Sequence, residues 1–578
     1  MKNKSVLSKI FQKFKPYSAL LFFALASAII SVGLTLYIPV LIGNAIDNII
    51  EKGKVNFDNI TGILIFISFC IVGVAVFQWL MNFFTNKASY NIVRDLRREM
   101  FNKFNNVPLS YIDAHPKGDL ISRLINDVDA VGDGLTQLIL QLFSGVVTIA
   151  GTLIFMLTID WKIALTVVVL TPLSLFVAAF IGKMSHKRFS EQQILQGEIS
   201  SYIEEYVGNQ ALVKTFSFEQ QAIERFDKLN TKLFTVGFKA QFAGALANPS
   251  TRFVNATVYA AVGILGALSA ISGLLSVGQL SCFLTYANQY TKPFNEVTGV
   301  LTQIQTAFAS ASRVFEILEA DDQTPDNPNT EKLKKCDGNV KIENVSFAYS
   351  KDTPLIKNFS LDVKSGSRVA IVGPTGCGKT TFINLLMRFY EIDGGKITID
   401  GVDIKQLARN DLRKLYGMVL QDSWLFSGTI MENLKYGNEN ATDEEAILAS
   451  KSAYAHSFIR RMADGYNTLI SEGGGNLSEG QKQLLCIARV MLTNPSILIL
   501  DEATSSIDTL TEIRVQKAFA KMMEGRTCFV VAHRLSTIKE SDVILVMKDG
   551  NIIEQGNHET LLSRGGFYSE LYNSQFKK

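Results

Sequence analysis

A glycine-rich segment in the second half of the chain has the residues needed to bind phosphate. It reads Gly373-Pro-Thr-Gly-Cys-Gly-Lys-Thr-Thr381, between the apolar runs Arg368–Val372 and Phe382–Phe389. This is G-x-x-x-x-G-K-[ST] in the order strand, loop, helix. Glycines let backbone N–H groups approach a phosphate, and the N-terminus of a helix attracts anions. The segment therefore predicts a nucleoside triphosphate site.

Each residue of this loop is expected to contact the nucleotide or its metal ion. Lys379 is expected to hold the β and γ phosphates, and Thr380 to supply a hydroxyl ligand to Mg²⁺. The other expected nucleotide-binding residues of the loop are Gly373, Pro374, Thr375, Gly376, Cys377, Gly378 and Thr381.

Two further apolar runs end in polar residues that suit the same site. Ser496–Leu500 precedes Asp501 and Glu502, and Thr527–Val531 ends two residues before His533. The carboxyl ends of parallel strands meet at one edge of a sheet. We expect Asp501 to hold Mg²⁺, Glu502 to act as the base for the attacking water, and His533 to contact the γ phosphate. A lone histidine is more often structural, but its place beside two carboxylates favours the catalytic interpretation.

The first half of the chain differs in composition from the half that contains these residues. It consists of long apolar runs separated by polar loops, although the whole chain of 578 residues is only 47% apolar. A helix needs about 20 apolar residues to cross a bilayer. Six runs meet this requirement and predict membrane spans: Tyr17–Ile42, Ile60–Phe84, Leu135–Leu157, Ile163–Ile181, Phe253–Ile271 and Val277–Ala307.

Basic residues predict how these spans are oriented. The N-terminus and the two long connections, Thr85–Thr136 and Gly182–Arg252, are rich in lysine and arginine. Positively charged loops stay in the cytoplasm, so both termini and both long connections are expected on that side of the cytoplasmic membrane. The i, i+4 spacing of apolar residues in Asn91–Asn105 predicts that the membrane helices continue beyond the bilayer. Arg252 and Lys292 either face a cavity or extend to the membrane surface.

The predicted fold is an all-α six-helix transmembrane domain fused to an α/β P-loop ATP-binding domain. We expect the first domain at residues 1–320, a polar linker at 321–338 and the second domain at 339–578. The net charge of +3 gives no reason to expect a nucleic-acid partner. Six spans also exclude a soluble ATPase that acts on DNA. The six cysteines contain no CxxC pair, so neither disulfides nor zinc are expected.

With these motifs in order, the chain resembles an ABC transporter of the exporter type over nearly its whole length. The resemblance rests further on Tyr349 in Val-Ser-Phe-Ala-Tyr, Gln421 in Val-Leu-Gln-Asp, the signature Leu477-Ser-Glu-Gly-Gln481, and Ser505-Ser-Ile-Asp508. It implies ATP and Mg²⁺ as ligands. It also implies that Tyr349 stacks on adenine and that Gln421 senses Mg²⁺ and faces the membrane domain.

The signature motif implies a dimer. In this family it completes the site of the opposing domain, so Ser478, Gly480 and Gln481 are expected at the γ phosphate that a partner holds. Asp508 belongs to the loop that follows the catalytic glutamate. The usual third residue of the signature is glycine, whereas this chain has Glu479. Either Glu479 faces solvent in a homodimer, or the chain pairs with a different half-transporter and completes a weaker site there.

The resemblance implies efflux driven by ATP hydrolysis through the cytoplasmic membrane. The apolar spans suit a hydrophobic or amphipathic substrate such as a drug or a lipid. Cytoplasmic segments near Tyr111–Leu120 and Ser217–Ala222 are expected to couple the domains. An ATP-gated channel or regulator on the same fold is one alternative. A peptide exporter is another, although the short segment before the first span leaves no room for the protease domain that often accompanies such exporters.

Overall fold

The computed structural model describes residues 2–49, 55–328, 330–331, 333, 335–350, 353–420, 423–501, 507–531 and 535–576. The chain divides into two compact units. The first consists of residues 1–106 and 115–320, and the second of residues 107–114 and 321–578. The helix α4 (Leu109–Asp113) therefore belongs to the second unit, although its sequence lies inside that of the first.

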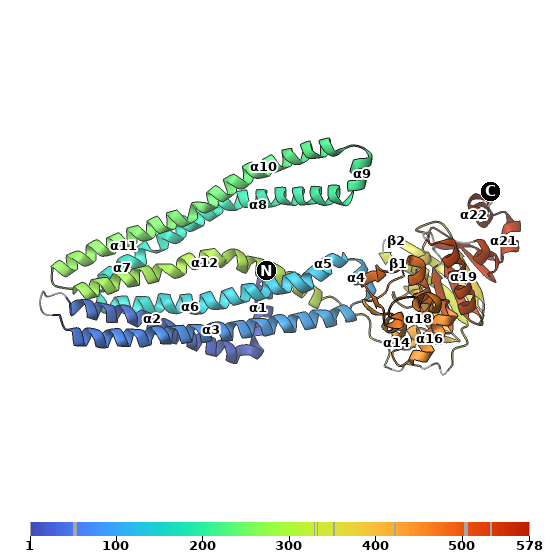
Figure 1. The fold of residues 1–578 in the computed structure, drawn as a ribbon, viewed down its shortest axis with the longest axis horizontal. Coiled ribbons are helices and arrows are strands. Elements are labelled where there is room, and N and C mark those ends of the chain that lie inside the picture. Colours follow the sequence, from blue (N-terminus) through green and yellow to red (C-terminus); the bar gives the residue numbers. More distant parts are fainter. Residues whose placement is uncertain are drawn as a thin grey trace. The chain divides into compact units, whose positions relative to one another are not determined.

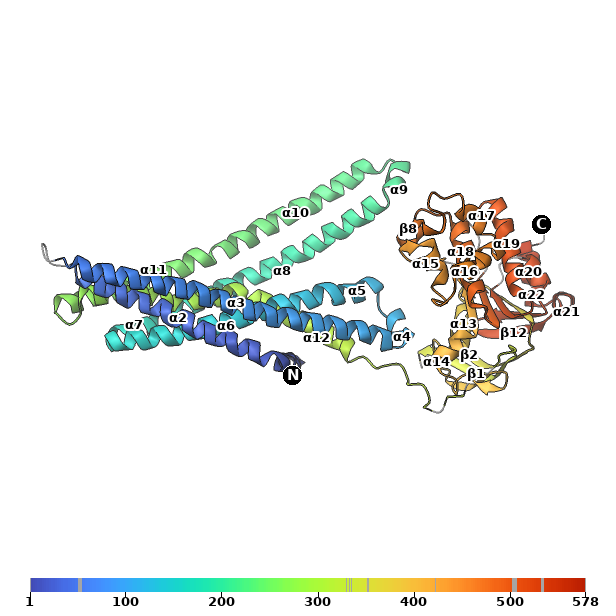
Figure 2. The same ribbon diagram turned by 60° about the horizontal axis from the view of Figure 1, so that its bottom comes forward.

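Every regular element described in the first unit is helical. Its helices are α1 (Lys2–Phe14), α2 (Ser18–Asp47), α3 (Phe57–Asn106), α5 (Lys117–Ser122), α6 (Val128–Ile159), α7 (Trp161–Leu170), α8 (Pro172–Gly208), α9 (Gln210–Thr215), α10 (Glu219–Ala245), α11 (Ala247–Ile271) and α12 (Val277–Leu318). The helices α2, α3, α6 and α12 pack along one another, and α8 and α10 form an antiparallel hairpin closed by α9 (Figures 1 and 2).

The helix α3 extends well past the thickness of a membrane. It has 50 residues, which at ~1.5 Å per residue gives a rod of about 75 Å. The hydrocarbon core of a bilayer is only about 30 Å thick. Ile92, Leu96 and Met100 are buried along one side of its far half. The prediction that Asn91–Asn105 continues a membrane helix is therefore confirmed.

Among the described residues, four helical stretches have the length and hydropathy to span a membrane. They are Ser8–Asp47, Phe57–Asn106, Lys117–Ile159 and Glu219–Ile271. The expected fourth span, Ile163–Ile181, is not one helix but is divided between α7 and α8. Pro172, the first residue of α8, cannot donate a backbone hydrogen bond, which explains the break. The expected sixth span lies within α12 and remains a prediction, as does the fourth.

The helices α2 and α12 meet backbone to backbone near one end of the unit. A Cβ atom on Gly278 would lie 2.1 Å from the carbonyl oxygen of Gly43, so only glycine permits this approach. Asp47, one turn further along α2, accepts hydrogen bonds from the Gly278 N–H at 2.8 Å and from the Ser276 hydroxyl at 2.6 Å. The carboxylate thereby caps the N-terminus of α12.

At the other end of the bundle, charged groups join α12 to a π-helical turn, Arg123–Asp127, that precedes α6. Buried Asp127 accepts hydrogen bonds from Arg313 and, at 2.9 Å, from the Ser310 hydroxyl. Arg123 pairs with Glu316 at 2.9 Å. Breaking a buried pair by removing one partner is costly, so these contacts hold the long helices in register.

The second unit contains two sheets. The antiparallel sheet has the order β2-β1-β4-β5, and the six-stranded sheet has the order β12-β11-β3-β10-β9-β6. The strands of the first are β1 (Val340–Ser350), β2 (Thr353–Val363), β4 (Gly394–Ile399) and β5 (Val402–Asp403). Those of the second are β3 (Arg368–Val372), β6 (Tyr416–Val419), β9 (Ile497–Asp501), β10 (Thr527–Val531), β11 (Val543–Lys548) and β12 (Asn551–Gly556). All but β12 pair in parallel, as buried α/β sheets do.

Helices and one short hairpin complete the second unit. The hairpin pairs β7 (Gly428–Thr429) with β8 (Leu469–Ile470). The helices are α13 (Lys379–Leu386), α14 (Arg409–Lys414), α15 (Ile430–Lys435), α16 (Asp443–Ser452), α17 (His456–Ile459), α18 (Glu479–Thr493), α19 (Thr509–Met523), α20 (Leu535–Lys539), α21 (His558–Arg564) and α22 (Phe567–Phe576). The prediction of a helical membrane region followed by an α/β domain is thus confirmed.

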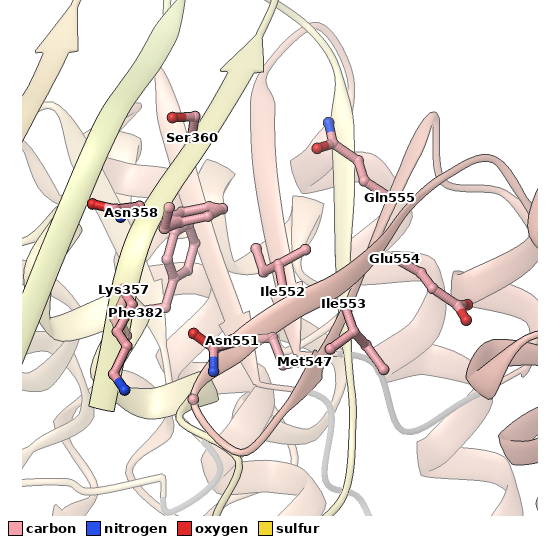
Figure 3. A pocket seen from close by; sticks show the side chains of 13 residues that line it. Lys357, Asn358, Ser360, Phe382, Met547, Asn551, Ile552, Ile553, Glu554 and Gln555 are labelled. Atoms are coloured by element: carbon pink, nitrogen blue, oxygen red, sulfur yellow. The ribbon is translucent and has the colours of Figure 1, made fainter. Parts of the chain in front are cut away.

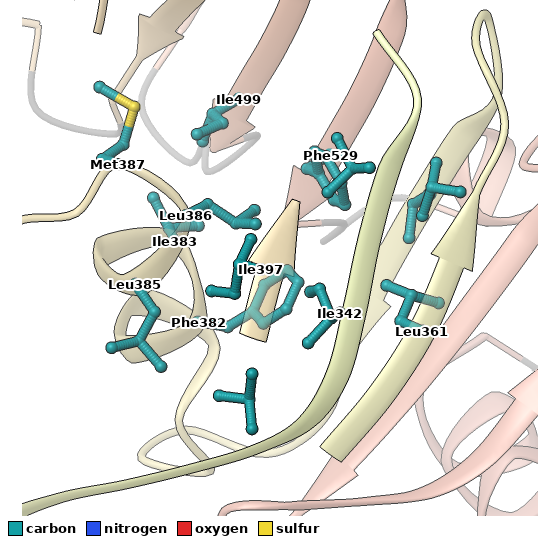
Figure 4. Close-up of a cluster of buried hydrophobic side chains, with 14 of the residues drawn as sticks. Ile342, Leu361, Phe382, Ile383, Leu385, Leu386, Met387, Ile397, Ile499 and Phe529 are labelled. Carbon is teal, nitrogen blue, oxygen red and sulfur yellow. The ribbon is translucent and has the colours of Figure 1, made fainter. Parts of the chain in front are cut away.

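One hydrophobic cluster of the second unit surrounds α13. Phe382 on this helix packs edge-on against Phe359 of β2, with ring centres 5.4 Å apart, and contacts Phe529 of β10 at 5.9 Å. Figure 4 shows Phe382 and Phe529 in this cluster, together with Ile342 of β1 and Ile397 of β4. Burial on both sides fixes α13, and therefore the loop that precedes it.

Candidate nucleotide-binding site

The predicted phosphate loop connects β3 to α13. The strand β3 lies between β10 and β11 at the centre of the parallel sheet, so the loop leaves from its carboxyl edge. Gly378, the N-cap of α13, has a φ of 101°, which side-chain-bearing residues rarely adopt. A Cβ on Gly373 would lie 2.3 Å from the carbonyl oxygen of Met547. Both glycines are therefore required by the path of the backbone.

Lys379 is directed back over this loop. Its ammonium donates hydrogen bonds to the carbonyl oxygens of Gly373 at 2.8 Å and Pro374 at 3.0 Å. The neighbouring Thr380 is exposed, whereas Cys377 is buried. Lys379 is also the first residue of α13, so the positive side chain of the loop belongs to a helix N-terminus, and both features favour a polyphosphate.

Tyr349, at the end of β1, lies next to α13. Its hydroxyl is 2.9 Å from that of Thr381, and its ring is about half exposed. Phe347 and Tyr390 contact the ring edge-to-face, with centroid distances of 4.9 Å and 5.1 Å. These contacts fix the orientation of the ring and leave part of its surface accessible for stacking on a base.

Asp501 lies at the same sheet edge as the loop. It is the last residue of β9 and pairs in register with Val531 of β10, which in turn pairs with Ile371 of β3. This row places the carboxylate two strands from the start of the loop. Three expected catalytic residues, Glu502, His533 and Gln421, lie outside the described residues, as do Ser505 and Ser506. Their roles remain predictions.

The signature segment forms the N-terminus of α18. Ser478 is the N-cap: its hydroxyl accepts a hydrogen bond from the Gln481 N–H at 3.3 Å, and the Gln481 side chain accepts one from the Ser478 N–H at 3.0 Å. This reciprocal pair is a capping box. Gly480 is buried, and a Cβ there would lie 2.4 Å from the Cγ2 atom of Thr511 on α19. The glycine therefore allows α18 and α19 to pack closely.

Glu479, the departure from the usual signature, has a partner on its own helix. Its carboxylate lies 2.7 Å from the ammonium of Lys482, one turn further along α18. The Lys482 side chain is 13% exposed and lies across Gly474, while that of Glu479 is 55% exposed. A well-packed lysine thus offsets the charge of the unusual glutamate.

Asp508 occupies the N-cap of α19. Its carboxylate accepts a hydrogen bond from the Thr511 N–H at 3.0 Å. Hydrogen bonds to Thr511 hold the pKa of Asp508 below its ordinary value, so the group is ionised at neutral pH. Asp508 and Gly480 both contact Thr511, which brings the loop after β9 and the signature segment together.

The predicted site residues therefore fall into two groups. The first group, at the carboxyl edge of the parallel sheet, contains Tyr349, the loop from Gly373 to Thr381, and Asp501. The second, at the N-termini of α18 and α19, contains Ser478, Gly480, Gln481 and Asp508. Sequence reasoning missed Lys482 and Tyr390. The i, i+3 spacing of Lys482 from Glu479 was a usable signal, whereas nothing in the sequence connects Tyr390 to Tyr349.

A pocket of about 380 Å³ lies behind the phosphate loop, between the edge strands β2 and β12. Figure 3 shows Asn358 and Lys357 on one wall, Asn551 and Gln555 on the other, and Phe382 between them. None of the predicted nucleotide-binding residues lines it. The pocket is therefore separate from the nucleotide site.

Comparison with known proteins agrees with this arrangement. Residues 21–294 match the family model for the ABC transporter transmembrane region, and residues 356–505 match the family model named ABC transporter. A fatty acid ABC transporter ATP-binding/permease protein of Mycobacterium tuberculosis is 40% identical over 524 residues, which is 91% of this chain and 83% of that protein. An ATP-dependent lipid A-core flippase of Desulfotalea psychrophila is 35% identical over the full length of both chains. An ABC transporter ATP-binding protein of Bacillus subtilis is 39% identical over 100% of this chain and 95% of its own.

These matches cover the transmembrane region and the ATP-hydrolysing domain, which are fused in one polypeptide. The chain is therefore a multi-pass membrane protein that belongs to the ABC transporters of the exporter type.

Proposed function

We propose that this chain is one half of a dimeric exporter that moves an amphipathic lipid, such as a fatty acid, out through the cytoplasmic membrane. The observation that carries the proposal is the division of the ATP-site residues into two groups on one chain. The phosphate loop and Asp501 form one group, and the signature segment forms the other. We further propose that residues 1–320 form a domain of six spans and that residues 339–578 form the ATP-binding domain.

In the proposed cycle the first group of residues binds ATP. Lys379 and the backbone N–H groups from Gly376 to Thr381 hold the phosphates, and Tyr349 stacks on adenine. The exposed Thr380 hydroxyl and the Asp501 carboxylate, with Gln421, fit the oxygen ligands that Mg²⁺ prefers. When bound, Mg²⁺ neutralises the phosphate charge. Glu502 orients and deprotonates the attacking water, and His533 contacts the γ phosphate.

The second group of residues serves the partner's nucleotide. The Ser478 hydroxyl accepts a hydrogen bond from the Gln481 N–H, so its own proton is left to donate to a ligand, as are the N–H groups of the first turn that have no intrahelical acceptor. We propose that they close over the γ phosphate held by a second half-transporter. Lys482 offsets the charge of Glu479, which is compatible with a homodimer. A heterodimer with a different half-transporter is the other assembly, and isolation of the complex from its native membrane distinguishes the two.

Two short helices are proposed to transmit closure to the membrane domain. The first is α4, which belongs to the ATP-binding unit by its contacts. The second is α9, at the tip of the α8–α10 hairpin, which leads directly into the expected coupling segment Ser217–Ala222. Leu212 and Phe216 of this tip are exposed and line a pocket of about 300 Å³ with Val213 and Phe218. A group of exposed apolar side chains on a cytoplasmic tip is typical of a protein-docking surface. We propose that α9 docks on the ATP-binding unit of the second half-transporter.

A lipid substrate is supported by the relatives and by the span composition. Two of them are named for fatty acid and for lipid A-core transport. The described spans contain apolar residues with few charges, which suits a molecule that partitions into the bilayer. A drug-like amphiphile is the broader form of the same proposal.

The test is transport by the purified full-length chain in liposomes. ATP added outside energises the copies whose ATP-binding unit faces outward, and it is expected to drive accumulation of a fluorescent fatty acid inside the liposomes against its gradient, with Glu502→Gln as the inactive control. Movement only down the gradient would instead indicate an ATP-gated channel, because a channel cannot move a solute uphill. Accumulation of peptides but not of fatty acids or lipids would reject the substrate class.

A further inference from the structure

A chain of contacts connects α4 with the phosphate loop. It begins at Asp113, the last residue of α4, whose Oδ2 atom accepts a hydrogen bond from the Tyr390 hydroxyl at 2.6 Å. Both residues belong to the ATP-binding unit. Burial, together with the Asp113 carboxylate, raises the pKa of Tyr390, so the phenol keeps its proton and acts as a donor at every physiological pH.

The ring of Tyr390 continues the chain to Tyr349. Phe347, Tyr349 and Tyr390 form a cluster in which each ring meets the other two nearly at right angles. The centroid distances are 4.9 Å for Phe347–Tyr349, 5.1 Å for Tyr349–Tyr390 and 5.7 Å for Phe347–Tyr390. Edge-to-face contacts depend on ring orientation. A shift of Tyr390 therefore cannot leave Tyr349 unaffected.

Tyr349 completes the connection to α13. Its hydroxyl lies 2.9 Å from that of buried Thr381, two residues after Lys379. One end of the Tyr349 ring is thus fixed to the phosphate-loop helix, and one edge is fixed by Tyr390. The ring is about half exposed, which leaves it accessible to a base.

We propose that Tyr390 is a positioning residue that couples α4 to adenine binding. The proposal rests on the proposed function in two respects, namely that Tyr349 stacks on adenine and that α4 transmits motion. Asp113 fixes the Tyr390 phenol, the Tyr390 ring orients Tyr349, and Tyr349 presents its face to the base. A displacement of α4 then changes the affinity for adenine, and by thermodynamic reciprocity a stacked adenine favours one position of α4.

The experiment compares a ligand that has the base with one that lacks it. The full-length chain in nanodiscs is loaded with fluorescent MANT-ATP, which is displaced by ATP or by tripolyphosphate. In Tyr390→Phe and in Asp113→Ala, ATP is expected to bind about threefold more weakly or worse. Tripolyphosphate, which contacts only the phosphate loop, is expected to bind as it does to the wild type.

The double variant and a matched tyrosine provide the controls. Asp113→Ala with Tyr390→Phe is expected to weaken ATP binding no further than either change alone, because both remove one hydrogen bond. Tyr466→Phe removes a hydroxyl that is hydrogen-bonded to His456 Nδ1 at 2.8 Å elsewhere in the same unit. This variant is expected to bind both ATP and tripolyphosphate as the wild type does. Equal weakening of both ligands, or unchanged ATP binding in the single variants, would overturn the proposal.

These outcomes are independent of the transported substrate, since no transport is measured. Tyr349→Ala tests separately the assumption that Tyr349 stacks on adenine. If this variant left the preference for ATP over tripolyphosphate unchanged, the adenine contact of the proposed function would be wrong. If the preference fell in Tyr349→Ala but held in Tyr390→Phe, only the coupling through Tyr390 would be rejected.

Discussion

The helices α13 and α18 both begin with a glycine-containing motif that predicts anion binding, yet their first turns differ. The N-cap of α13 is Gly378, which has no side chain to cap the helix, and Lys379 follows it directly. The N-cap of α18 is Ser478, whose hydroxyl accepts from the Gln481 N–H while the Gln481 side chain accepts from the Ser478 N–H, so two backbone donors of the turn are already satisfied. A negative residue, Glu479, comes next. The phosphate loop thus offers a positive side chain and uncapped N–H groups that can bind an anion without help. The signature turn is already capped, so it is suited to add contacts to an anion that another site binds.

The largest expected effect tests whether ATP hydrolysis depends on residues at the carboxyl edge of the parallel sheet, beside the phosphate loop. Glu502→Gln keeps the size of the side chain and removes its basicity. ATP hydrolysis by the full-length chain is expected to fall by about 10²- to 10⁴-fold, the range for loss of a general base, while MANT-ATP still binds. Lys379→Ala is the contrasting variant and is expected to lose binding as well. Undiminished hydrolysis in Glu502→Gln would reject the assignment of the base.

The next effect concerns the packing behind the signature turn. Gly480→Ala places a Cβ atom 2.4 Å from Thr511 and 2.9 Å from Ile507. We expect a loss of about 1–3 kcal/mol in stability, typical of overpacking, together with loss of hydrolysis because the α18 N-terminus shifts. Thermal unfolding measures the first and ATPase assay the second. The control is Gly525→Ala, at a position where no atom lies within 4 Å but where φ is 70°, so it reports backbone strain without a clash.

A smaller effect separates capping from catalysis in the signature turn. Ser478→Ala removes an N-cap and is expected to lower the free energy of unfolding by about 1 kcal/mol. Thr442→Ala removes the N-cap of α16, which has the same kind of capping box outside both groups of site residues, and is expected to cost a similar amount. If Ser478 also contacts the partner's phosphate, its variant loses more ATPase activity than this stability loss explains. Equal activity in the two variants would leave Ser478 with a capping role alone.

The smallest effect concerns Glu479. Lys482→Met keeps the packed stem over Gly474 and removes the ammonium, so Glu479 is left uncompensated near the proposed partner phosphate. The KM for ATP is expected to rise a few-fold, because the charges interact across a partly solvated gap. Adding Glu479→Gly to this variant is expected to restore the KM. An unchanged KM in Lys482→Met would place Glu479 away from the nucleotide.

The sequence predicts the order and type of these elements well because the motifs carry their own local geometry. The run Arg368–Val372, the loop glycines and the helix after them fold as one strand–loop–helix unit in the structure. The break at Pro172 was not expected, because hydropathy alone does not register a missing N–H. The Asp113–Tyr390 contact joins residues 277 positions apart, and no local pattern reports it. The Glu479–Lys482 pair is local, but its importance depends on the packing of the lysine stem.

The length of α3 has a mechanical consequence. The helix is one continuous hydrogen-bonded rod of 50 residues that ends at Asn106, three residues before α4 begins. With an arm of about 75 Å, a tilt of only about 5° at one end sweeps the other through about 6 Å. A small rotation of α3 within the helical bundle therefore produces a large displacement at its end, close in sequence to the start of α4. Because the helix is continuous, no hinge is needed for this displacement.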